Sequence, residues 1–305
     1  MNHNPSPKQY LTAAVLVFLG AVFVSTKAIL VKLAYQYDID SASLLTLRLL
    51  FAFPFFVGIL MWHSVKKSKD LPRLKPKDWF RIALLGMSGY YAASLCDFIG
   101  LEYITASFER IVLYLYPTIV LILSFVFLKQ KINKNQIWAL VLTYVGVGLA
   151  FWENLQMHLG DNVILGTAFV FASALFYSFY LLGSGVILPK IGTIRFNSVA
   201  MMAAGFGMFT HHFLFIQTNL FSFEMPVYYL ALAMAIFATV IPTFLIVEGV
   251  RVIGPNNAAI ITSIGPISTI VLAYIFLDER LGWIQWTGTL FVIAGVLLIT
   301  LRKSV

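Results

Sequence analysis

Five charged residues lie inside long apolar stretches and are the first candidates for chemistry: Lys27, Arg48, Asp97, Glu109 and Arg110. An unpaired charge at the centre of a bilayer costs about 2.5–3.5 kcal/mol. Because both signs occur at a similar predicted depth, we expect these groups to pair with one another. Asp97, a short acid well inside its stretch, is our first candidate for a carboxylate that couples transport to a proton. The alternative is that Lys27 and Arg48 extend to the membrane surface and that Glu109 and Arg110 only cap the start of a helix.

Two prolines, Pro117 and Pro266, interrupt apolar stretches that are otherwise helical in pattern. Each proline removes a backbone donor and leaves a carbonyl without its helical partner. We expect both stretches to line a central pocket, with inherited packing geometry as the alternative. Polar residues share a helix face with these prolines: Arg110 and Tyr114 beside Pro117, and Thr262 and Thr269 beside Pro266, with Ser263 adjacent.

Tyrosines inside the apolar stretches, among them Tyr90, Tyr91, Tyr177 and Tyr180, could stack on a planar solute. The residues that we expect to bind substrate are Lys27, Arg48, Tyr90, Tyr91, Asp97, Arg110, Tyr114, Pro117, Thr262, Ser263 and Pro266. Motifs of zinc hydrolases, P-loop ATPases and serine hydrolases do not occur in the sequence. We therefore expect no catalytic residues, no metal and no cofactor, and transport that is driven by a gradient or is passive.

The elements that must position these residues are membrane helices. The chain of 305 residues is 60% hydrophobic and only 11% charged, which excludes an ordinary soluble enzyme. A helix needs about 20 apolar residues to cross a bilayer. Apolar runs predict an all-α protein with ten spans at 10–34, 42–62, 79–100, 107–128, 136–152, 163–188, 196–217, 227–249, 257–277 and 283–301.

The charge distribution predicts the orientation of these spans. Short loops at 63–78 and 129–135 are rich in Lys and Arg, whereas 153–162 and 218–226 carry acids and no Lys or Arg. Because Lys and Arg are retained on the cytoplasmic side, both termini should be cytoplasmic. The protein is then a multi-pass protein of the cytoplasmic (inner) membrane. The net charge of +8 is explained by topology, so no nucleic-acid partner is expected.

An internal repeat is the strongest single signal. A shift of 149 residues aligns 98–150 with 247–299 without a gap and pairs Pro117 with Pro266 and Gly146 with Gly295. Each half holds five spans, an odd number, so the second half must be inverted. Inverted repeats are typical of secondary transporters. We expect a tail at 1–9 and two five-helix repeats at 10–152 and 163–301.

Several segments give the sequence a family resemblance: Gly20-Ala21-Val22-Phe23 with Lys27, Arg48 in the second span, Ala-Ser before the Pro-bearing fourth span, and Phe276-Leu-Asp-Glu-Arg280 leading to Gly288 and Gly295. In these segments the chain resembles the EamA-type branch of the drug/metabolite transporter superfamily. The resemblance implies ten helices in two inverted EamA-like repeats, cytoplasmic termini, and movement of small metabolites such as amino acids. Gln130 stands where the first repeat usually carries an acid.

The favoured function is a secondary transporter, with export as the favoured direction, of amino-acid-like or amphipathic solutes by alternating access. The expected partners are a small-molecule substrate and the lipid bilayer, and protons are a candidate coupling ion. A nucleotide-sugar or phosphate-ester exchanger remains an alternative, because Lys27, Arg48 and Arg110 could supply its cations. A polytopic membrane enzyme or a channel is a further alternative.

The predicted topology is testable with single cysteines at Lys69, Lys131, Asp161 and Asp278 in a background without Cys96. An impermeant thiol reagent added to intact cells should label positions 161 and 278 and leave 69 and 131 unlabelled, because the basic loops are expected inside. Labelling of positions 131 and 278 from the same side would contradict the inverted repeat.

Overall fold

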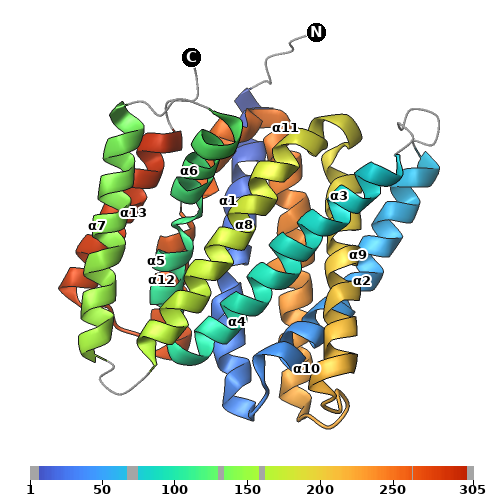
Figure 1. Cartoon of the computed structure of the whole chain (residues 1–305), viewed down its shortest axis with the longest axis horizontal. Helices are drawn as coiled ribbons and strands as arrows, with labels where there is room; N and C mark the ends of the chain where they lie inside the picture. Colours follow the sequence, from blue (N-terminus) through green and yellow to red (C-terminus); the bar gives the residue numbers. More distant parts are fainter. Residues whose placement is uncertain (1–6, 67–74, 130–133, 158–161, 263, 301–305) are drawn as a thin grey trace.

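The computed structural model describes residues 7–66, 75–129, 134–157, 162–262 and 264–300, and its regular elements within these ranges are all helical (Figure 1). The α-helices are α1 (Pro7–Ala34), α2 (Ser41–Lys66), α3 (Pro76–Gly86), α4 (Ala93–Tyr103), α5 (Ala106–Leu113), α6 (Tyr116–Leu128), α7 (Lys134–Met157), α8 (Val163–Ile191), α9 (Thr193–His211), α10 (Met225–Ala235), α11 (Ile241–Thr262), α12 (Gly265–Leu277) and α13 (Trp283–Thr300). Short turns of other helix types are η1 (Tyr35–Tyr37), η2 (Met87–Ala92), η3 (His212–Ile216) and η4 (Ile236–Val240).

The prediction of an all-helical membrane fold is confirmed. In the described part of the chain, 8 helical segments are long and apolar enough to cross a membrane, and the last two predicted spans match shorter apolar helices at Gly265–Leu277 and Trp283–Leu298. Residues 257–262 differ from the prediction, because they form the last turns of α11 instead of opening a separate span. Helical backbone continues through Pro255, so this proline does not end the helix there.

Helix boundaries recur in the two halves at the same shift of 149 residues. α3 and α10 each run for 11 residues and then pass into the π-helical turns η2 and η4. α6 and α12 each begin with a proline in the first turn, where the missing N–H costs nothing. Both then end at a residue in the left-handed region, Lys129 with φ 53° and Asp278 with φ 51°. The internal repeat is therefore present in the backbone itself.

The two halves run in opposite directions. Glu279, the second residue after α12, accepts a hydrogen bond from the backbone N–H of Ala106 in the first turn of α5. α6 continues the direction of α5 and ends at the other end of the molecule (Figure 1). We name the end where α1 begins and α13 ends the terminal end, and the opposite end the distal end. α6 thus ends at the terminal end and α12 at the distal end.

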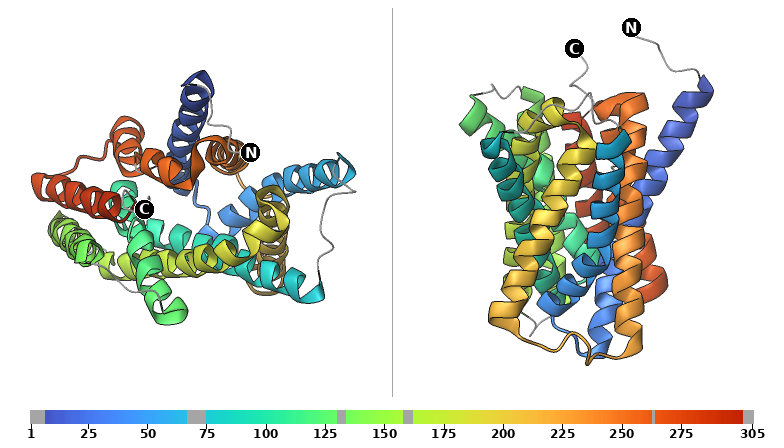
Figure 2. Two further views of the ribbon diagram at one scale, coloured as in Figure 1. Left: turned by 90° about the horizontal axis from the view of Figure 1, so that it is seen from above. Right: turned by 90° about the vertical axis from the view of Figure 1, so that its right-hand side faces the viewer.

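The first helices of the two halves exchange places. α1 packs against α10, α11 and α12, and α8 packs against α4, α5 and α6. We call α3–α6 with α8 the first bundle, and α10–α12 with α1 the second bundle. Two mixed pairs, α2 with α9 and α7 with α13, flank these bundles (Figure 2).

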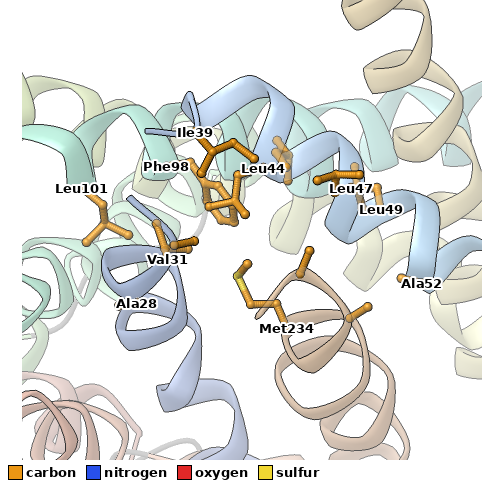
Figure 3. Packing of buried hydrophobic residues seen from close by; sticks show 14 of the residues in the cluster. Ala28, Val31, Ile39, Leu44, Leu47, Leu49, Ala52, Phe98, Leu101 and Met234 are labelled. Atoms are coloured by element: carbon orange, nitrogen blue, oxygen red, sulfur yellow. The ribbon is translucent and has the colours of Figure 1, made fainter. Parts of the chain in front are cut away.

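An apolar cluster fills the distal half between α1, α2, α4 and α10. Val31, Leu44, Phe98, Leu101 and Met234 have no exposed surface. Figure 3 shows these side chains converging from the four helices. Packing of this kind excludes water around the charged groups that lie next to it.

The contact between α7 and α13 depends on glycine. A Cβ atom on Gly146 would lie 2.5 Å from the carbonyl oxygen of Gly288, whereas a Cβ atom on Gly148 would meet nothing within 4 Å. Gly146→Ala should therefore cost about 1–3 kcal/mol of folding free energy through overpacking. Gly148→Ala is the matched control and should be neutral or slightly stabilising, since Ala is the better helix former. Melting temperatures of the two purified variants measure the difference, and equal values would contradict the close approach.

Candidate functional site

Four of the five charged residues form one buried cluster. Lys27 on α1 pairs through Nζ with the carboxylate of Asp97 on α4, and Nζ lies 3.5 Å from Oε1 of Glu109 on α5. Arg110 Nε lies 4.0 Å from Glu109 Oε2. Both acids are fully buried, and only 14% of the Lys27 side chain is exposed. The predicted mutual pairing is present, and Lys27 does not extend outward to the membrane surface. We name these four residues the ion cluster.

Hydrogen bonds from Arg110 and Tyr114 join the two bundles. Arg110 Nε donates to Thr269 Oγ1 on α12 at 3.0 Å, and Nη2 donates to the carbonyl of Val24 on α1 at 3.4 Å. One turn further on, the Tyr114 hydroxyl donates to the carbonyl of Thr262 at 2.7 Å. The two polar faces that the sequence predicted beside Pro117 and Pro266 therefore meet. Pro117 is half-buried, Pro266 is buried, and Ser263 lies outside the described residues.

Arg48 lies beside the ion cluster but does not pair with it directly. Its Nε donates to Thr239 Oγ1 at 3.0 Å, and its guanidinium carbon lies 5.5 Å from the centre of the Phe98 ring. Asp97 and Tyr90 are close enough to interact with its charge. The residue is 6% exposed, so it too does not extend to the membrane surface.

A row of tyrosines continues from the ion cluster along the first bundle. Ring centres are 5.8 Å apart for Tyr114 and Tyr116, 5.3 Å for Tyr116 and Tyr177, and 5.8 Å for Tyr177 and Tyr180. The row ends at Tyr90, whose hydroxyl lies 3.0 Å from that of Tyr180. Such edge-to-face and stacked contacts fix ring orientation. The row combines ring faces with hydroxyl groups, which suits an amphipathic solute.

Tyr91 does not join this row. Its hydroxyl lies 3.0 Å from Nδ1 of His211 on α9, and the two rings meet edge to face. The sequence placed Tyr90 and Tyr91 together, but successive residues of a helix point in different directions. Tyr91 thus belongs to the contact between η2 and α9.

Glu279 joins the two bundles at the distal end. Its two carboxylate oxygens accept hydrogen bonds from the backbone N–H groups of Ala106 at 2.8 Å and Ser107 at 2.9 Å. A carboxylate at the N-terminus of a helix satisfies free donors and is favoured by the helix dipole. The loop after α12 is thereby tied to the start of α5.

Sequence reasoning did not single out Glu279, Thr239 or Tyr116 as members of the site. A usable signal existed for Thr239, because the repeat shift of 149 residues pairs it with Tyr90. In the described part of the chain, no group of three His, Cys, Asp or Glu residues is arranged to hold a metal ion.

The EamA-like transporter family model matches residues 11–152 and again 164–301. Together with the helical membrane frame and its inverted repeat, this match defines a membrane transporter of the drug/metabolite type. The chain belongs to this family. A Bacillus subtilis relative named uncharacterized transporter YcbK is 31% identical over 299 residues, which cover 95% of this chain and 94% of the relative.

A second relative and a solved structure are also similar to the chain. The uncharacterized transporter YetK of Bacillus subtilis is 24% identical over 240 residues, covering 77% of this chain and 72% of the relative. A solved crystal structure of a protein with 13% sequence identity superposes with a TM-score of 0.64 and covers 97% of this chain and 99% of that structure. At this identity the superposition shows a shared fold.

Proposed function

We propose that the protein is a secondary active transporter that exports small organic metabolites, such as amino acids or amphipathic solutes, by alternating access. One observation carries the proposal: charged and polar side chains of both repeats meet where α6 and α12 begin. We call these two short helices, which carry Pro117 and Pro266 in their first turns, the half-helices. Arg110 with Thr269 and Tyr114 with Thr262 are the contacts at this point. Sites of this kind at a repeat interface are where secondary transporters bind solutes.

The distal end is the closed end in our proposal. The ion cluster and the Glu279 cap both join the first bundle to the second in the distal half. Opening this end requires these contacts to break together. An inverted repeat offers a second arrangement of similar energy, in which the terminal end closes instead.

We assign the terminal end to the cytoplasm because the loops at 63–78 and 129–135 carry most of the basic residues of the connecting segments. The distal end then faces outward, with the protein in the cytoplasmic (inner) membrane. With this orientation a solute released distally leaves the cytoplasm, which is why we propose export.

A nucleotide-sugar or phosphate-ester exchanger fits the site less well. Such solutes carry two or more negative charges and need several free cations. Asp97 and Glu109 already neutralise Lys27 and Arg110, which leaves Arg48 as the cation of the site without a direct acidic partner in the described residues. The charge balance therefore favours a solute with little net charge.

Counterflow in proteoliposomes tests the function. Vesicles that contain the purified protein and are loaded with unlabelled amino acids should transiently accumulate a ¹⁴C-labelled amino-acid mixture added outside. A carrier gives saturable exchange of this type, whereas a channel gives leak without accumulation. Leak alone, or no movement of any amino acid, amine or neutral amphiphile, would contradict the proposed function.

Asp97→Asn tests proton coupling. The variant keeps the size and polarity of the side chain but cannot carry a proton, so exchange should persist while accumulation driven by a pH gradient is lost. Asp278→Asn is the matched control, because Asp278 is exposed and Asn tolerates its left-handed conformation. Uptake with and without a pH gradient measures the difference. Full accumulation by Asp97→Asn would remove Asp97 from coupling, and loss of the folded protein would assign it a structural role.

A further inference from the structure

Arg48 lies near two residues that the internal repeat makes equivalent. Thr239 on η4 accepts its hydrogen bond, and Tyr90 on η2 is near enough to interact with its charge. The shift of 149 residues pairs Tyr90 with Thr239 and η2 with η4. A residue near equivalent positions of both repeats lies near their pseudo-two-fold axis. In transporters with inverted repeats, that axis passes through the solute site.

Both neighbours of Arg48 are on π-helical turns. Thr239 Oγ1 itself donates to the carbonyl of Met234 at 3.0 Å, five residues earlier, which fixes the hydroxyl that Arg48 contacts. π-Helical turns are rare and occur frequently at functional sites. Their occurrence at equivalent places in both halves, near one arginine, indicates a site that belongs to the function of the fold.

The guanidinium group is only partly used. Phe98 stacks near it and Thr239 binds Nε, but the buried Nη1 has no hydrogen-bond partner in the described residues. A buried donor without a partner is unfavourable, more so when it is charged. An arginine fork with a free nitrogen matches the geometry of a carboxylate.

The balance of charges in this region also indicates that the Arg48 guanidinium binds an anion. The ion cluster holds two cations and two acids, and Arg48 adds a third cation. One carboxylate from a solute restores neutrality in this buried region. On the acidic side, Asp97 Oδ1 lacks a hydrogen-bond partner and could accept an ammonium group. The free donor and this free acceptor together fit a zwitterion.

We propose that Arg48 binds the carboxylate of the transported solute, so that the protein prefers solutes that carry a carboxylate to otherwise similar solutes that lack one. This inference rests on the proposed transport function. Arg48 would then determine specificity, because a solute without a carboxylate leaves the guanidinium unpartnered.

The experiment compares amino acids with their carboxamides, which keep the amine and lose the negative charge. Each unlabelled set competes with a ¹⁴C-labelled amino-acid mixture in the counterflow assay. The wild-type protein should favour amino acids by at least about tenfold, or about 1.4 kcal/mol. Arg48→Gln should abolish this preference while exchange of carboxamides persists. Arg48→Lys keeps the charge but loses the fork, so its preference should be intermediate.

Arg280→Gln is the matched control, because Arg280 is 76% exposed and should leave the preference unchanged. Equal competition by carboxamides in the wild type overturns the inference, as does an equal loss of both exchange activities in Arg48→Gln and Arg48→Lys. Competition by chloride as strong as that by amino acids would make Arg48 an inorganic-anion site and also overturns it. Exchange of amines or neutral amphiphiles by the wild-type protein with no exchange of amino acids overturns the inference and leaves the transporter standing. Absence of any exchange contradicts both.

Discussion

The buried ion cluster is the interaction on which the rest of the structure depends. Asp97 and Glu109 are removed from both water and lipid, and Lys27 reaches them from the opposite bundle. Removing one partner of a buried ion pair typically costs about 3–5 kcal/mol, because the remaining charge is left uncompensated. The two bundles must therefore stay together in the distal half while these groups are charged. In our proposal, transport uses this constraint, since opening the distal end requires another group to compensate the same charges.

The backbones of the two halves match each other, but their charged side chains do not. At the shift of 149 residues, Asp97 corresponds to Ile246 and Glu109 to Ala258, so the second repeat carries apolar residues where the first carries acids. The repeat provides matched half-helices and π-helical turns, whereas the charged residues of the ion cluster, together with Arg48, come from the first half. One charged site in a two-fold frame can face either end without a second copy of its charges. This division of roles agrees with a carrier that offers one site to two sides in turn.

The sequence predicted the positions of the helices better than the side-chain contacts of the candidate site. Apolar run length set the spans, and paired Pro117 and Pro266 located the two half-helices, because both signals act locally along the chain. Mutual pairing of the ion cluster followed from the cost of unpaired charge. The partners themselves did not follow: Thr239 for Arg48 and Glu279 for the start of α5 are fixed by packing between residues far apart in sequence. Tyr91 illustrates the same limit, since only the orientation of η2 separates it from Tyr90.

The distance between the distal ends of the two bundles tests the central claim most directly. Ile164 on α8 and Met225 on α10 are exposed there, and spin labels at these positions, with Cys96 replaced by Ser, report the separation by pulsed electron paramagnetic resonance. If the ion cluster holds this end closed, the otherwise native protein should give one narrow distribution, and Lys27→Met should add a population at longer distance. A folded Lys27→Met protein with an unchanged, narrow distribution would contradict the account.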